Sequence, residues 1–193
     1  MNKKIIFPAF IVMVLVQLYI PVKMIINKES VLARGKEFRF KTAPIDPTDP
    51  FRGKYITLSF EANSTNIPDA EGWNQGEEIY VLLGEDEKGF AKINSLSKEK
   101  PIDIEDYVTA SIGYVIDDTL DWVSIDYPFT RFYMEESKAG NAEEAYREAA
   151  RDTSQVTYAL VSIKNGEAVV KDVLINDIPI KEVIKSQAEH QEE

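Results

Sequence analysis

Cysteine is absent from the 193-residue chain, and histidine occurs once, at His190. Without cysteine the chain forms no disulfide, has no thiol nucleophile and holds no metal through thiolates. His190 lies in residues 186–193, whose polar composition predicts a disordered tail. A catalytic triad that needs histidine and a multi-histidine metal site are therefore excluded, and we expect no cofactor and no metal site.

Basic residues are also scarce. The chain carries 22 Lys and Arg against 33 Asp and Glu, which gives a net charge of −11. Lys3, Lys4 and Lys23 flank an apolar run, so the rest of the chain has 19 basic against 33 acidic residues and a charge of −14. An acidic surface repels nucleic-acid phosphates and anionic lipid headgroups. The balance argues against nucleic-acid binding and against a domain that lies flat on an anionic membrane.

Charge is missing from residues 5–22, an uninterrupted run of 18 residues near the N-terminus. As a helix the run would be about 27 Å long, close to the thickness of the hydrocarbon core of a bilayer. Residues 24–26 lengthen it by nearly a turn if the Lys23 ammonium reaches the interface. The sequence therefore predicts a transmembrane helix within residues 1–26.

A cleaved signal peptide would also begin with lysines and an apolar core. Cleavage needs small residues after that core, but residues 18–25 are bulky throughout, which favours an uncleaved signal anchor. Lysines occur on both sides of the run, so the orientation follows instead from the short leading segment with its lysine pair. We expect the N-terminus in the cytoplasm, an inner-membrane anchor, a juxtamembrane linker at 27–35, and an extracytoplasmic domain at 36–185.

Beyond the anchor, apolar residues mostly alternate with polar ones, as in half-buried strands. Phe38 and Phe40 alternate in a first strand, and residues 55–60 alternate in a second that is rich in β-formers. Residues 61–76 are predicted as a loop because Asn, Ser, Gly and Pro concentrate there. Further strands are predicted within 79–83, 90–93, 107–116, 120–127, 129–134, 155–163 and 168–175.

Turn and cap residues complete the predicted fold. Asn165 and Gly166 separate two strands and suit a type I′ hairpin turn, which needs positive φ at both positions. Residues 84–89 form a charged hairpin tip with glycine at each end. A single helix is predicted to begin at Asn141, with Glu144 completing a pair that resembles a capping box. The fold class is mainly β with one helix, an antiparallel barrel-like or sandwich domain behind a single transmembrane helix.

The most distinctive stretch, residues 46–60, reads DPTDPFRGKYITLSF. It resembles the signature of the GDYXXLXY family, with Gly53, Tyr55 and Leu58 at the matching positions. Lys54 stands where the family usually has Asp, and Phe60 replaces the final Tyr. Because Lys54 replaces this Asp, no role of the family's Asp is assigned to this chain.

A second segment, residues 129–136, also resembles the family. Its candidate interaction residues are Arg131, Tyr133, Glu135 and Glu136. With the anchor, the resemblance covers nearly the whole chain. It implies a membrane-anchored extracytoplasmic β domain, often linked to multi-span membrane proteins, and it implies no reaction.

The first motif allows a structural and a functional interpretation. Prolines that follow Asp46 and Asp49 hold both residues in extended geometry, and Gly53 permits a turn into the next strand. Arg52 would brace this loop by pairing with either carboxylate, which is the favoured interpretation. In the functional interpretation, Arg52 or Lys54 contacts an anionic group or a partner protein.

The sequence points to a non-enzymatic accessory or interaction module that is tethered to the membrane and works with a multi-span membrane protein. The alternative is a binding or sensory domain for a small ligand or a cation, which would use Arg52, Lys54, Glu135 or Glu136. A remote alternative is a membrane-anchored hydrolase built on Glu135 and Glu136 beside Arg131. That reaction needs a second carboxylate across a cleft, and the sequence places none there.

Overall fold

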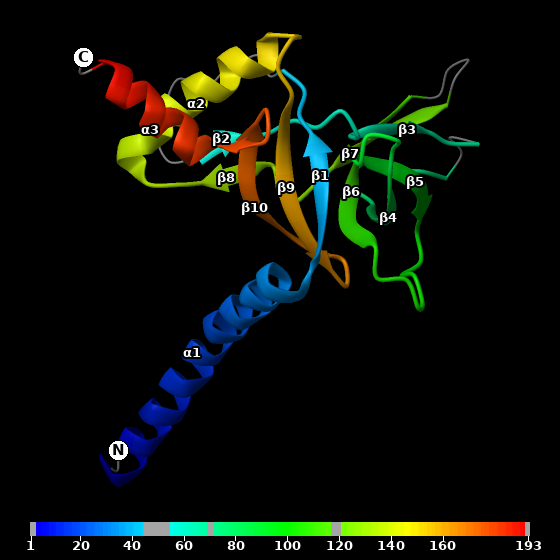
Figure 1. The fold of residues 1–193 in the computed structure, drawn as a ribbon. Coiled ribbons are helices and arrows are strands. Elements are labelled where there is room, and N and C mark those ends of the chain that lie inside the picture. The colour runs from blue at the N-terminus through cyan, green and yellow to red at the C-terminus, as the bar shows by residue number, and fades with distance from the viewer. Residues whose placement is uncertain (1–2, 45–54, 69–71, 117–120, 192–193) are drawn as a thin grey trace.

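The protein is described by a computed structural model that covers residues 3–44, 55–68, 72–116 and 121–191, with side chains from Phe7 to Gln187 within those ranges. Helix α1 runs from Lys3 to Arg34 and extends away from the rest of the molecule (Figure 1). Its segment Phe7–Arg34 is long and apolar enough to cross a membrane, and none of its apolar window is buried inside the molecule. The helix continues through most of the segment 27–35, where the sequence predicts a linker.

The last turns of α1 are attached to the domain by packing and polar contacts. Val31 is only 3% exposed, and the Ser30 hydroxyl lies 2.9 Å from the Lys164 ammonium. Gly35 alone separates α1 from the first strand, and a Cβ there would lie 2.5 Å from the Val31 carbonyl oxygen and 2.9 Å from that of Ile163. Such close approach of three backbone segments requires glycine. Helix α1 is therefore closely packed against the domain at the point where it meets the first strand.

The first sheet has the order β1-β9-β10-β11 and is antiparallel. Its strands are β1 (Lys36–Lys41), β9 (Thr157–Lys164), β10 (Glu167–Ile175) and β11 (Ile178–Pro179). Asn165 and Gly166 connect β9 to β10 with φ of 51° and 85°. The predicted hairpin and its positive-φ turn are confirmed.

A second, five-stranded sheet has the order β3-β7-β6-β4-β5. Its strands are β3 (Ser64–Asn66), β4 (Glu78–Glu85), β5 (Ala91–Ser97), β6 (Tyr107–Ile116) and β7 (Trp122–Asp126). The β4–β5 and β6–β7 pairs confirm the hairpins predicted for these segments. Strand β3 was not predicted, because it lies in the polar stretch interpreted as a loop and pairs only with a distant strand, β7.

The predicted strand over residues 55–60 is divided between two partners. Strand β2 (Tyr55–Thr57) pairs with β8 (Arg131–Tyr133), whereas Phe60 forms an isolated bridge with Thr42 at the end of β1. The apolar positions of the segment are nevertheless buried, as their alternation predicts. The alternation of apolar residues predicts which face of a strand is buried, but it does not predict where the strand stops pairing with one partner and begins pairing with another.

Isolated bridges bring the two larger sheets together into a nearly closed, barrel-like arrangement. Arg39 of β1 bridges Phe90 beside β5, and Val108 of β6 bridges Gly166. The enclosed core contains an aromatic cluster of Phe40, Phe60, Tyr127 and Phe129, with ring centroids 5.0–6.0 Å apart. The mainly β fold class behind one long N-terminal apolar helix is confirmed.

Two helices pack beside the first sheet, where the sequence predicts one (Figure 1). Helix α2 spans Glu136–Arg151, so the prediction that it begins at Asn141 is wrong. The buried alanines at 139, 142, 145 and 149 form one face that starts before Asn141, and burial of this face outweighs the local cap signal. Helix α3 spans Ile180–Gln191 and includes most of the segment 186–193, for which the disordered tail stays a prediction.

Candidate functional site

The two segments that resemble the family are neighbours in the structure. Tyr55 of β2 lies opposite Tyr133 of β8, and Thr57 lies opposite Arg131. The pairing continues beyond the strands, because the Leu58 amide donates a hydrogen bond of 2.9 Å to the Thr130 carbonyl. Two motifs that are distant in the chain thus form one two-stranded sheet.

The inner face of this small sheet belongs to the core. Ile56 and Leu58 are 0% and 2% exposed, and Phe132 is 5% exposed. These side chains belong to the core cluster of the domain. Leu58 at the matching position therefore has a packing role.

The outer face carries an aromatic and cationic patch of Tyr55, Arg131 and Tyr133, called the motif patch below. The two tyrosine rings have centroids 5.5 Å apart, and the Arg131 guanidinium carbon lies 5.0 Å from the centroid of the Tyr55 ring. A hydrogen bond with the Tyr133 side chain raises the pKa of Arg131 further above its usual range. Tyr133 is nevertheless 64% exposed, so the patch is open to a partner.

Five of the predicted site residues lie outside the residues that the structure describes. They are Asp46, Asp49, Arg52, Gly53 and Lys54. Both interpretations of this segment, a braced loop and a cationic binding loop, stay predictions.

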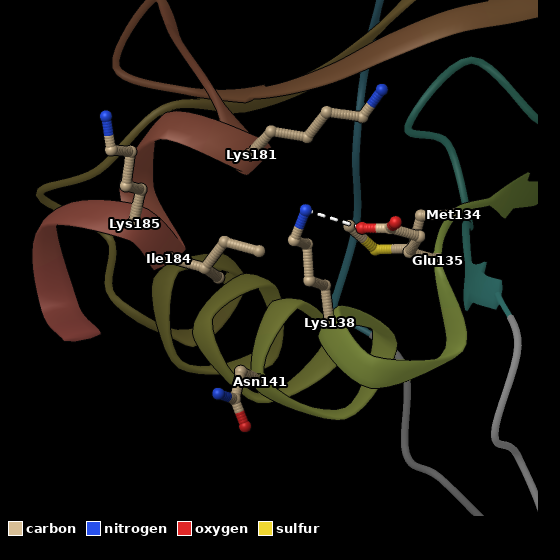
Figure 2. A pocket seen from close by; sticks show the side chains of 7 residues that line it. All are labelled: Met134, Glu135, Lys138, Asn141, Lys181, Ile184 and Lys185. Carbon is tan, nitrogen blue, oxygen red and sulfur yellow. Dashed lines mark ion pairs between the residues drawn. The ribbon is translucent and has the colours of Figure 1, made fainter.

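Immediately after β8 the chain borders a pocket of about 460 Å³ between α2 and α3. Its lining consists of Met134, Glu135, Lys138, Asn141, Lys181, Ile184 and Lys185 (Figure 2). Glu135 is thus brought to the pocket as a predicted site residue, whereas Glu136 is the first residue of α2 and does not line it. The two carboxylates that are adjacent in sequence have different surroundings.

Lysines dominate the polar lining of this pocket. The Lys138 ammonium forms an ion pair with the Glu135 carboxylate at 2.5 Å, drawn as a dashed line in Figure 2. The hydrogen bond from Lys138, with a smaller contribution from the charge of Lys181, lowers the pKa of Glu135. Glu135 therefore remains ionised at neutral pH and is already matched by a cation.

The fold of α3 explains how two further lysines reach the pocket. Ile180 and Ile184, four residues apart, are 0% and 7% exposed and hold the helix on the domain. Lys181 and Lys185 follow them by one position each, so they share the adjacent helix face. The sequence analysis missed these lysines because α3 was not predicted. The available signal was the spacing of four between Ile180 and Ile184 and between Lys181 and Lys185, which is typical of a helix.

The pocket does not have the composition of a paired-carboxylate hydrolase site. Among the described residues that line it, Glu135 carries the only carboxylate, and Arg131 is not part of the lining. Over the described part of the chain, no group of three or more His, Asp or Glu side chains could hold a metal ion. The described lining carries more positive than negative charge, which suits an anion, and it lacks the second carboxylate of a paired-carboxylate site.

Comparisons with known proteins agree with the motif residues. No curated protein and no solved structure matches the chain. A family model described as GDYXXLXY protein matches residues 17–173, from the middle of α1 to β10, and includes both strands of the motif patch. Since this match covers most of the chain, the protein belongs to the GDYXXLXY family.

Proposed function

We propose that this protein is a membrane-tethered extracytoplasmic interaction domain that works with a multi-span membrane protein. The observation that carries the proposal is the motif patch, in which both family motifs contribute to one exposed surface. Tyrosine and arginine are enriched among the residues that supply most of the binding energy of protein interfaces. The patch thus has the composition expected of a protein contact.

The junction of α1 with the sheet supports a partner in the same membrane. Besides the burial of Val31, the Lys28 ammonium lies 3.0 Å from the Glu167 carboxylate of β10. A domain that is held by its anchor at a fixed angle presents the same surface to every neighbour in the bilayer. This preorganisation reduces the entropy lost when the two proteins associate.

The proposal is tested by recovering partners of the full-length protein from detergent-solubilised membranes. We expect the native chain to recover a multi-span protein. The double variant Arg131→Ala/Tyr133→Ala should reduce this recovery at least about tenfold, because central interface residues contribute about 2 kcal/mol or more each. Both side chains point outward from β8, so the variant should keep the native circular dichroism spectrum.

The matched control is Tyr114→Ala. Tyr114 is 51% exposed and belongs to β6 of the other sheet, where its ring contacts Trp122. Recovery that is lost equally in both variants would show a nonspecific effect of removing surface tyrosines. A folded double variant that still recovers the multi-span protein at the native level, or a folded native chain that recovers none, would contradict the proposal.

A small-ligand or sensory function is the second candidate, and the pocket between α2 and α3 is the observation that favours it. The lining has three lysines and one carboxylate, so its charge favours an anion over the cation considered from the sequence. The hydrolase alternative receives no support from this pocket, because a second carboxylate is missing among its described lining residues.

A further inference from the structure

The pocket between α2 and α3 has a charge opposite to that of the chain. Lys138, Lys181 and Lys185 give its lining a net charge of +2 after Glu135 is counted, whereas the chain as a whole carries −11. Lys181 and Lys185 are four residues apart on one helix, a placement in which like charges repel. This local excess of positive charge in an acidic protein is complementary to an anion.

The backbone adds to this positive potential. Glu135 is the N-cap of α2, and Lys181 is the second residue of α3, so the pocket lies at the N-terminal ends of both helices. Helix N-termini carry a partial positive charge. The two helix ends and the lysines therefore attract the same kind of group.

One wall of the pocket is apolar. Ile184 is 7% exposed, and Met134 is half-buried against the core. Figure 2 shows Ile184 between the two helices and Met134 beside Glu135 in the segment before α2, with Lys181 and Lys185 extending from α3 and Lys138 from α2. The site thus combines a cationic rim with an apolar wall.

We propose that this pocket binds a small anionic amphiphile, a carboxylate or phosphate monoester that carries an apolar group. The anionic head contacts the lysines, and the apolar group packs on Met134 and Ile184. A volume of about 460 Å³ falls in the usual size range of small-molecule sites. A bilayer lipid and a soluble metabolite both offer this chemistry. The proposal is independent of the motif patch and of any protein partner.

The test uses the full-length protein in phosphatidylcholine nanodiscs, titrated calorimetrically with hexyl phosphate. Inorganic phosphate and hexanol serve as probes of the two halves of the ligand. We expect hexyl phosphate to bind, and each half alone to bind at least about tenfold more weakly, because head and apolar group contribute separately. Equal affinity for inorganic phosphate would overturn the assignment of the apolar wall.

Variants locate the binding. Lys181→Gln/Lys185→Gln should weaken the binding of hexyl phosphate about tenfold or more, because two charged contacts are lost. The control Lys88→Gln/Lys92→Gln removes the same charge from exposed positions of the β4–β5 hairpin and should leave the affinity unchanged. Met134→Ser should weaken hexyl phosphate while leaving the weak binding of inorganic phosphate unaltered.

The source of the ligand is distinguished by replacing part of the phosphatidylcholine with phosphatidic acid, a lipid whose head group is a phosphate monoester. If the anionic lipid lowers the apparent affinity for hexyl phosphate in the native chain but not in Lys181→Gln/Lys185→Gln, the occupant is a bilayer lipid. If the affinity of the native chain is unchanged, the occupant is a soluble amphiphile. No heat of binding at millimolar hexyl phosphate, or equal weakening in the two double-lysine variants, would overturn the proposal.

Discussion

Tyr127 combines aromatic packing in the core with a hydrogen bond from its hydroxyl group. Its ring contacts Phe40, Phe60 and Phe129, and its hydroxyl donates a hydrogen bond of 2.8 Å to the Ala62 carbonyl. Burial raises its pKa well above the ordinary value of 10.0. Burial likewise raises the pKa of Tyr146, to about 12. Both side chains stay neutral in the folded protein at a pH at which the unfolded chain already ionises.

This difference predicts a loss of stability in alkali. Below the unfolded-state pKa of 10.0 both states keep the tyrosine proton, and the stability of the fold is fully present. As the pH rises above 10.0 the free energy of unfolding falls, because the unfolded state releases the proton first. Tyr127→Phe should lower the free energy of unfolding at pH 7 by about 1 kcal/mol through the lost hydrogen bond. It should also make the alkaline decline shallower.

Urea unfolding of both proteins between pH 7 and a pH of about 11 measures these effects. Because Tyr146 remains in the variant, part of the decline should persist. An alkaline decline of the same steepness in Tyr127→Phe and the native chain would show that the buried Tyr127 hydroxyl is not its source.

Among the elements, the β9–β10 hairpin connects the two larger sheets. Its turn residue Gly166 bridges Val108, and its carbonyl accepts a hydrogen bond of 2.9 Å from the Thr109 amide. Gly166 has a φ of 85°, and a Cβ there would lie 2.6 Å from Thr109 Oγ1 and 2.7 Å from the Tyr107 ring. Tyr107 is buried and cannot move away without cost. The turn therefore needs glycine both for its backbone and for its tertiary contact.

Gly166→Ala is predicted to destabilise the domain by about 2–4 kcal/mol, as the sum of left-handed strain and overpacking. Gly89→Ala is the matched control, because Gly89 has a similar φ of 79° but a Cβ there would meet nothing within 4 Å. That variant should cost only the backbone strain, about 1–2 kcal/mol. Urea midpoints of the two variants measure the difference, and equal midpoints would contradict the tertiary role of Gly166.

At the scale of the whole molecule, α1 and the domain form a continuous unit. The apolar part of the helix is unburied, whereas its last turns are held by Val31, Ser30 and Lys28. Among the described residues, Lys28–Glu167 is the only side-chain ion pair that joins this end of the helix to a strand. Any membrane that the helix crosses therefore lies at the end of the domain where α1 enters it.

The absence of cysteine makes the topology directly measurable. Because we propose that the domain is extracytoplasmic, Lys92→Cys should react with a membrane-impermeant maleimide in intact cells. Asn2→Cys should react only after the cells are permeabilised, because we expect the N-terminus in the cytoplasm. The chain has no other thiol, so all labelling reports the introduced position. The reversed pattern would contradict an extracytoplasmic domain.

Sequence alone determined the apolar run of residues 5–22, the Asn165–Gly166 turn and the buried alternation of residues 55–60, because each depends on local chemistry or on a short period. The start of α2 and the presence of α3 were decided by tertiary packing. Burial of an alanine face extends α2 to Glu136, and burial of Ile180 and Ile184 holds α3 on the domain. The pairing of the two motifs and the lysine-lined pocket likewise join distant segments, and only the folded chain brings such segments together.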